Sequence, residues 1–170
     1  MKIFISAIAL AALPMTVQAQ EIDPNVDFTR LNKSGFVNEM RAMGEASWEP
    51  MMALYGRLDP SLAELVPEFP WSSEFDDAYG CVYQGLSGRS ALGDVNELRD
   101  KTIRLVDYIQ SSEDVTFASL EDDDTLLELM LPSDDLVEVS RDCGVQDLNI
   151  QALRESGLMD AFMAVVMGDG

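Results

Sequence analysis

The side chains that most often carry out catalysis are scarce in this chain, which contains no histidine and only two cysteines, Cys81 and Cys143. Without histidine, a Ser-His-Asp or Cys-His catalytic apparatus, a histidine-ligated zinc site and ordinary haem ligation are excluded. The sequence also lacks a GxSxG motif, a P-loop and a dinucleotide-binding fingerprint. We therefore expect a protein that is not an enzyme and that uses no cofactor.

Carboxylates are the one abundant group with chemical reactivity, since 31 of the 170 residues are Asp or Glu. A pair of carboxylic acids can act as general acid and general base in hydrolysis. With so many acids, some pair lies at a suitable separation by chance, and their number alone indicates no site. A carboxylate-based hydrolase is therefore the weakest of the functional hypotheses.

The two cysteines are best explained by a disulfide between Cys81 and Cys143. Neither residue belongs to a CxxC or CxxCH motif, and the missing histidines argue further against a metal-binding or reactive pair. An export signal, described below, implies an oxidising compartment in which disulfides persist. The bond is expected to join two predicted helices, 73–86 and 133–143, across nearly half of the mature chain.

Methionines supply the only candidate metal ligands with regular spacing. Met159 and Met163 fall on successive turns of a predicted helix, and Met40 and Met43 form a second pair. Thioether sulfurs are soft ligands that suit Cu(I). The same positions lie on the apolar faces of the predicted helices, where methionine commonly fills gaps in a core or lines an adaptable binding surface. We expect no metal site here, and a Cu(I) or small-ligand carrier is the alternative function.

Residues 1–19 have the features of a secretory signal peptide, with Lys2 at the start, an apolar run over Ile3–Leu13 and small residues before a cleavage site after Ala19. As a helix, the eleven residues of the apolar run would rise about 16 Å, which is too short for a hydrocarbon core of about 30 Å. No later segment is long and apolar enough to span a membrane. We therefore expect a periplasmic protein with no integral membrane segment after signal cleavage.

The net charge of −20 limits the possible partners. From Ser112 onward, fifteen acidic residues are accompanied by only two basic ones, Arg141 and Arg154. A field of this sign repels nucleic acids and anionic lipid surfaces, so neither is an expected partner. Two interpretations of the acidity remain: solubility, which includes adaptation to a salty habitat, and an acidic face that docks a basic partner or collects cations.

Apolar residues recur every three or four positions along most of the mature chain, which predicts short helices separated by glycine and proline. The first helix is expected to start at Ser34 and to weaken at Gly44, with a second helix starting at Ser47 and carrying Pro50 in its first turn. The aromatic residues of the connector 66–71 are expected to cover a helical core. Further helices are expected at 73–86, 94–109, 126–131, 133–143, 147–157 and 158–167.

The sequence thus predicts an all-α protein, an irregular bundle of about six or seven short helices with one disulfide. A polar N-terminal arm, 20–33, precedes a single domain, 34–170, since no repeat, linker or low-complexity block divides the chain. The favoured function is a non-enzymatic binding or interaction module for a basic or cationic partner.

Overall fold

The computed structural model describes residues 22–111, 113–116, 118–119, 124, 128–129 and 131–168. Within these ranges the chain is helical and contains no strand. The prediction of an all-α irregular bundle with one disulfide is confirmed. None of the described helices is long and apolar enough to cross a membrane. The elements are η1 (Phe28–Arg30), α1 (Lys33–Leu58), α2 (Pro60–Ala63), α3 (Ser73–Arg89), α4 (Gly93–Ser111), α7 (Asp134–Asp142), α8 (Val145–Glu155) and α9 (Leu158–Met167).

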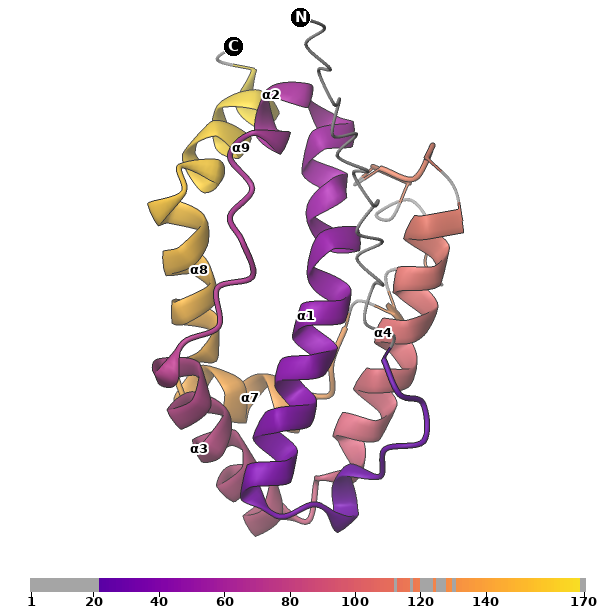
Figure 1. Cartoon of the computed structure of the whole chain (residues 1–170), viewed down its shortest axis with the longest axis vertical. Coiled ribbons are helices and arrows are strands. Elements are labelled where there is room, and N and C mark those ends of the chain that lie inside the picture. Colours follow the sequence, from indigo (N-terminus) through magenta and orange to yellow (C-terminus); the bar gives the residue numbers. More distant parts are fainter. Residues whose placement is uncertain are drawn as a thin grey trace, which may run out of the picture.

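Helix α1 runs along the length of the bundle, and the other helices pack around it (Figure 1). Helix α4 packs on one side of α1, and α3 packs on the other near the lower end of the view. Helices α7, α8 and α9 follow one another from the α3 end toward the end where α2 lies. The connector 66–71 belongs to the segment that returns from α2 to α3 between α1 and α8, and its residues are half-buried or exposed.

Helix α1 is continuous, and the predicted break between Gly44 and Ser47 is wrong. Pro50 lies in the interior of this 26-residue helix, not in the first turn of a second one. An interior proline costs about 3 kcal/mol or more in helix stability. Here tertiary packing outweighs that penalty, since Pro50 is buried and the ring of Phe69 lies 3.0 Å from the position that a Cβ on Gly44 would occupy.

The buried side chains form two clusters at different levels along α1. The larger cluster joins η1 and the first half of α1 to α3, α4, α7 and α8, while the smaller one lies between the second half of α1 and α4. The edge of the Phe28 ring packs against Phe36, with 5.7 Å between ring centroids, so the predicted polar arm supplies a core residue. Residues central to the larger cluster are Met40, Met43, Ala78, Val82, Leu86, Val95, Leu136, Val139 and Val145, and the smaller comprises Leu54, Leu105, Ile109 and Val115.

Helix α1 starts one residue before the predicted start, and α3 extends three residues beyond the predicted end at 86. The N-cap of α1 is Asn32 instead of Ser34, and its side chain accepts a hydrogen bond of 2.8 Å from the amide of Gly35. The N-cap of α3 is Ser72, and the helix itself begins at Ser73, as predicted. Asn and Ser are both residue types that are favoured at N-caps, so the residues around each helix start do carry a local capping signal.

Asp94 was expected to begin the helix predicted at 94–109, but α4 begins one residue earlier, at Gly93. The Asp94 carboxylate instead accepts a hydrogen bond of 2.6 Å from the hydroxyl of Ser133. Ser133 is the N-cap of α7, as predicted, and its Oγ also accepts from the amide of Leu136. This pair of bonds links the start of α4 to the start of α7.

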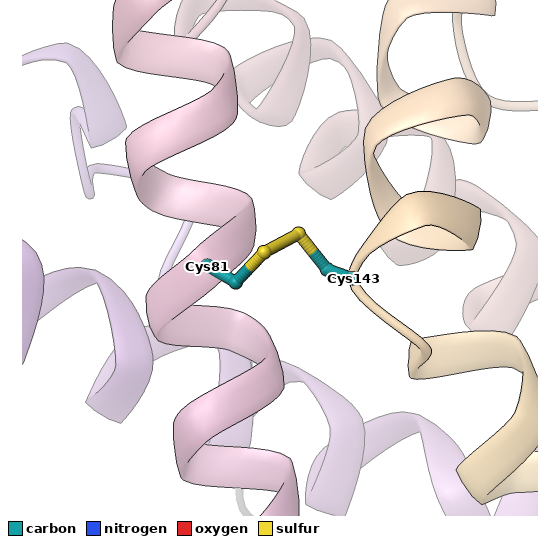
Figure 2. Close-up of a disulfide and its surroundings, with 2 residues drawn as sticks. All are labelled: Cys81 and Cys143. Carbon is teal, nitrogen blue, oxygen red and sulfur yellow. A yellow bond between two sulfur atoms is a disulfide. The ribbon is translucent and has the colours of Figure 1, made fainter.

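The predicted disulfide is confirmed: Cys81 on α3 is bonded to Cys143, which lies at the turn between α7 and α8 (Figure 2). The two Cα atoms are 5.7 Å apart, which is an ordinary separation for a disulfide. Gly144, which ends α7 as predicted, has φ of 77° and starts the turn into α8. A left-handed φ of this kind is where glycine is favoured over other residues.

Removing the disulfide should lower the free energy of unfolding by about 4 kcal/mol, because a cross-link over 62 residues restricts the unfolded chain. Urea denaturation of the double variant Cys81→Ser/Cys143→Ser, compared with the oxidised wild type, measures this difference. Reduced wild-type protein should unfold at the same urea concentration as the double variant. Coincident midpoints for oxidised and reduced protein would contradict the expected stabilisation.

Helix α3 approaches α7 closely at Gly85. A Cβ added to Gly85 would lie 2.6 Å from Cγ1 of Val139, which is too short for a carbon–carbon contact. Gly88, one turn later on the same helix, has no atom within 4 Å of its potential Cβ. The two glycines therefore form a matched pair for testing the contact.

Gly85→Ala should destabilise the fold by about 1–3 kcal/mol, since the added methyl group forces Val139 or the helix itself to move. Gly88→Ala should stabilise it by about 0.5–1 kcal/mol, because alanine has the higher helix propensity and meets no obstruction. Thermal unfolding followed by circular dichroism compares the two variants. Equal shifts in the same direction would show that α3 and α7 are not in tight contact at this position.

Candidate functional site

An aromatic pocket lies where α1, the connector 66–71, α3 and α8 meet. It has a volume of about 180 Å³ and is the more enclosed of the hollows described here. Apolar, aromatic walls with a few polar groups are the usual composition of small-ligand sites. We call this site the aromatic pocket; it is lined by Gly44, Ser47, Trp48, Phe69, Pro70, Trp71, Phe75, Tyr79 and Asn149.

The aromatic rings of the pocket form one continuous series of contacts. Trp48 and Phe69 are inclined at 58° with 5.8 Å between centroids, and Phe69 contacts Trp71 at 5.7 Å. Trp71 in turn stacks on Phe75 at 5.5 Å and on Tyr79 at 5.1 Å. Residues from three separate elements are therefore held in place by ring contacts, each of which contributes about 0.5–1.5 kcal/mol beyond burial of surface.

Polar contacts fix the orientation of both indoles. The Trp48 Nε1 donates a hydrogen bond of 3.0 Å to the carbonyl of Pro67, and the Trp71 Nε1 donates one of 2.8 Å to the Asp76 carboxylate. Arg41 also donates to Asp76, at 2.5 Å, and its guanidinium lies over the Trp71 ring, 5.4 Å from the centroid. The hydrogen bond from Trp71, followed by that from Arg41, lowers the pKa of Asp76 below its usual value.

Few polar groups line the aromatic pocket itself. Burial raises the pKa of Tyr79 to about 12, so its hydroxyl stays protonated at neutral pH. The Asn149 amide nitrogen donates to the carbonyl of Val145, and the Ser47 hydroxyl donates to that of Gly44. No charged side chain of the described residues lines the aromatic pocket.

An open groove of about 470 Å³, the acidic groove, lies between α3 and α8 beside the disulfide. Three exposed carboxylates line it: Glu74, Asp77 and Asp147. None of the three has an ion-pair partner among the described residues. Consecutive residues line the two neighbouring hollows: Ala78 and Leu148 line the acidic groove, and Tyr79 and Asn149 line the aromatic pocket. The other lining residues of the acidic groove are Ala78, Cys81, Cys143, Gly144, Leu148 and Gln151.

Most cationic side chains are used within the fold. All lysines and arginines except Lys2 lie in the described part of the chain, and six of them form ion pairs with acids at 2.5–3.6 Å. Arg57 donates to the main-chain carbonyls of Ile109 and Val115. Few positive charges therefore remain to offset the acidic surface. The six are Arg30, Arg41, Arg89, Arg99, Lys101 and Arg141.

The four methionines considered as Cu(I) ligands do not come together. Met40 and Met43 are buried in the larger core cluster, whereas Met163 on α9 is 43 % exposed and Met159 is half-buried. Helix α9 contacts α1 through the Phe162 and Tyr55 rings. Tyr55 lies twelve residues beyond Met43, which is about 18 Å along the helix. The two methionine pairs therefore belong to different parts of the molecule.

No group of three or more carboxylates, cysteines or histidines within the described ranges is arranged to hold a metal ion. The acidic run 121–124 and the predicted helix 126–131 fall largely outside those ranges. A third hollow of about 430 Å³, between α1 and α3, has mixed charge because Lys33 and Arg41 face Asp76 and Asp77. Mixed charge gives this hollow no preference for one sign of ligand.

The connector 66–71 was predicted to cover the core, and its aromatic residues do pack inward, but the pocket that they form was not predicted. Phe69 and Trp71 precede Phe75 and Tyr79 by only a few residues, so an aromatic concentration was visible in the sequence. The opposite wall comes from Trp48, for which the sequence gives no signal of proximity. The acidic groove was also not predicted, since the acidity was assigned mainly to the region after Ser112.

Asp76→Asn should lower the free energy of unfolding at pH 7, because it removes the ion pair with Arg41 and weakens the bond from Trp71. A carboxylate whose folded-state pKa is below 3.8 stabilises the fold above that pH, and this contribution disappears as the pH falls through the folded-state pKa. The difference between variant and wild type should therefore shrink when urea unfolding is repeated at about pH 3.

Asp77→Asn is the control, since this neighbouring carboxylate has no ion-pair partner among the described residues. It should change stability little at either pH. A deficit in Asp76→Asn that is equally large at both pH values would mean that the charge of Asp76 is not its source.

Comparisons with protein-family models, with curated proteins and with solved structures find no match to this chain. A functional proposal therefore depends on the chemistry of the two neighbouring hollows, the aromatic pocket and the acidic groove.

Proposed function

We propose that this chain is a small acidic binding protein, exported to the periplasm, that captures a basic or cationic partner without catalysing a reaction. The observation that carries the proposal is the acidic groove, where Glu74, Asp77 and Asp147 lack ionic partners among the described residues. Signal-peptide features in residues 1–19 and a disulfide, which persists in oxidising compartments, support the location.

The electrostatic argument concerns the difference between paired and unpaired charges. Carboxylates such as Asp135 and Glu138 are already paired with Arg89, at 2.9 Å each, and gain less from an external cation. The carboxylates of the acidic groove are not neutralised in this way, so a cation placed between α3 and α8 would meet several negative charges at once. The net charge of −20 adds an attractive field that speeds encounter with positively charged partners.

The shape of the acidic groove suits a polymeric partner better than a small ion. Its volume of about 470 Å³ is open to solvent, and its carboxylates come from two helices. An extended basic segment can lie along such a surface and place successive side chains near different carboxylates. Because the contacts remain exposed, their strength depends on ionic strength.

A lysine-rich peptide should bind the mature protein at low salt, and its affinity should fall steeply as salt is added. Exposed ion pairs contribute about 0.2–1 kcal/mol each, so the triple variant Glu74→Gln/Asp77→Asn/Asp147→Asn should bind about ten-fold more weakly. Fluorescence anisotropy with a labelled peptide measures both effects.

The matched control is Glu64→Gln/Asp107→Asn/Asp160→Asn, which removes the same charge from exposed positions just after α2, on α4 and on α9. It should weaken binding by no more than about two-fold to three-fold, because it alters only the long-range field. Equal losses in the two triple variants would remove the acidic groove from the proposal, and salt-independent binding would contradict its electrostatic basis.

A further inference from the structure

The walls of the aromatic pocket present ring surfaces and few hydrogen-bond donors. Both tryptophans of the chain, Trp48 and Trp71, line this pocket. Their indole N–H groups are bonded to the Pro67 carbonyl and to Asp76, so neither donor is free for a ligand. A ligand that needs donors, such as a carboxylate or phosphate, would find few there.

Ring surfaces of this kind attract cations, because the face of an aromatic ring carries partial negative charge. Trp48 and Phe69 are inclined at 58°, and two rings at such an angle can both face a group placed between them. The same aromatic series already holds one cation, the Arg41 guanidinium over Trp71. Cation–π attraction is therefore in use within this cluster.

The charge around the aromatic pocket has the sign that favours a cationic ligand. No lysine or arginine of the described residues lines the pocket, and the neighbouring acidic groove carries the unpaired Glu74, Asp77 and Asp147. The net charge of −20 raises the local concentration of cations further. A neutral ligand would gain nothing from this field, and an anion would be repelled.

Among the described residues, the polar side chains that line the aromatic pocket are Ser47, Tyr79 and Asn149, and no carboxylate is among them, which bears on the class of cation that the pocket would take. A primary ammonium has three N–H donors that lose hydrogen bonds to water on entry, and leaving them unpaired is costly. A quaternary ammonium has no N–H group and loses none. The volume of about 180 Å³ exceeds the roughly 150 Å³ of an engineered cavity that holds benzene, so one trimethylammonium group fits.

We propose that the aromatic pocket binds a quaternary ammonium group, presented by a small ligand of the choline type. The inference shares with the proposed function the positive charge of the ligand and the negative field of the acidic groove, but the side chains that would contact the ligand are a different set. Trp48, Phe69 and Tyr79 supply ring surfaces for the methyl groups, and Trp71, held by Asp76, keeps the ring series in place.

Intrinsic fluorescence provides a direct test, because both tryptophans lie at the aromatic pocket. Tetramethylammonium and choline should each change the emission of the mature protein in a saturable way, at constant ionic strength. The neutral isostere 3,3-dimethyl-1-butanol should bind about ten-fold more weakly, since it lacks the charge. Titration of N-acetyltryptophanamide corrects for collisional quenching.

The variant Phe69→Leu keeps an apolar side chain but removes one ring, and it leaves both tryptophans as reporters. It should bind tetramethylammonium about five-fold more weakly while its affinity for the neutral isostere changes little. Tyr108→Leu, which alters an exposed ring on α4, should leave both affinities unchanged. The comparison of the two ligands on the wild type needs no variant and remains decisive if Phe69→Leu fails to fold.

Equal affinity of the wild type for choline and its neutral isostere, 3,3-dimethyl-1-butanol, would overturn the inference, and so would the absence of any saturable change. These results are separable from the test of the acidic groove. Binding of the lysine-rich peptide without binding of tetramethylammonium would remove only the quaternary ammonium site. Binding of tetramethylammonium without binding of the lysine-rich peptide would support the quaternary ammonium site and contradict the role proposed for the acidic groove.

Discussion

Close approach of α3 to its neighbours is the constraint on which the described part of the bundle depends. Gly80 lies under the side chain of Lys33 from α1, and Gly85 lies against Val139 from α7. Between them, Cys81 is covalently bonded to the turn that precedes α8. Only the flexible end of the exposed Lys33 side chain meets Gly80, so it is the Gly85 contact and the disulfide that fix α3 against α7 and the start of α8. The N-terminal half of α3 then supplies rings to the aromatic pocket and carboxylates to the acidic groove.

Features encoded by local spacing were predicted well from the sequence. The periodicity of apolar residues predicted a helix over 73–86, and α3 extends from Ser73 to Arg89. The cysteine pairing followed from composition and compartment, since only one intramolecular pair is possible. The continuous α1 was not predicted, because Gly44 and Pro50 lower helix propensity locally while the packing that offsets this, such as Phe69 against Gly44, comes from distant residues.

The candidate site was less accessible to sequence reasoning, because its walls come from segments far apart in the chain. Trp48 on α1, the connector 66–71 and Asn149 on α8 meet only once the bundle has formed. Similarly, the net charge was obvious, but which carboxylates are left unpaired depends on where arginines such as Arg41 and Arg89 reach. Composition gives the sign of the expected ligand, whereas tertiary structure gives its location.

The disulfide divides the chain into a covalently closed ring and the two segments that lie before and after it. Residues 81–143 form a covalent ring that contains α4 and α7. Apart from the two cysteines, every residue that lines the aromatic pocket or the acidic groove lies outside this ring, in 44–79 or in 144–151. The site is thus assembled from the two chain segments that enter and leave the ring. Sequence changes inside the ring can alter how the bundle packs while the residues that line both hollows stay the same. A single backbone cleavage inside the ring leaves the two lining segments covalently joined through the disulfide.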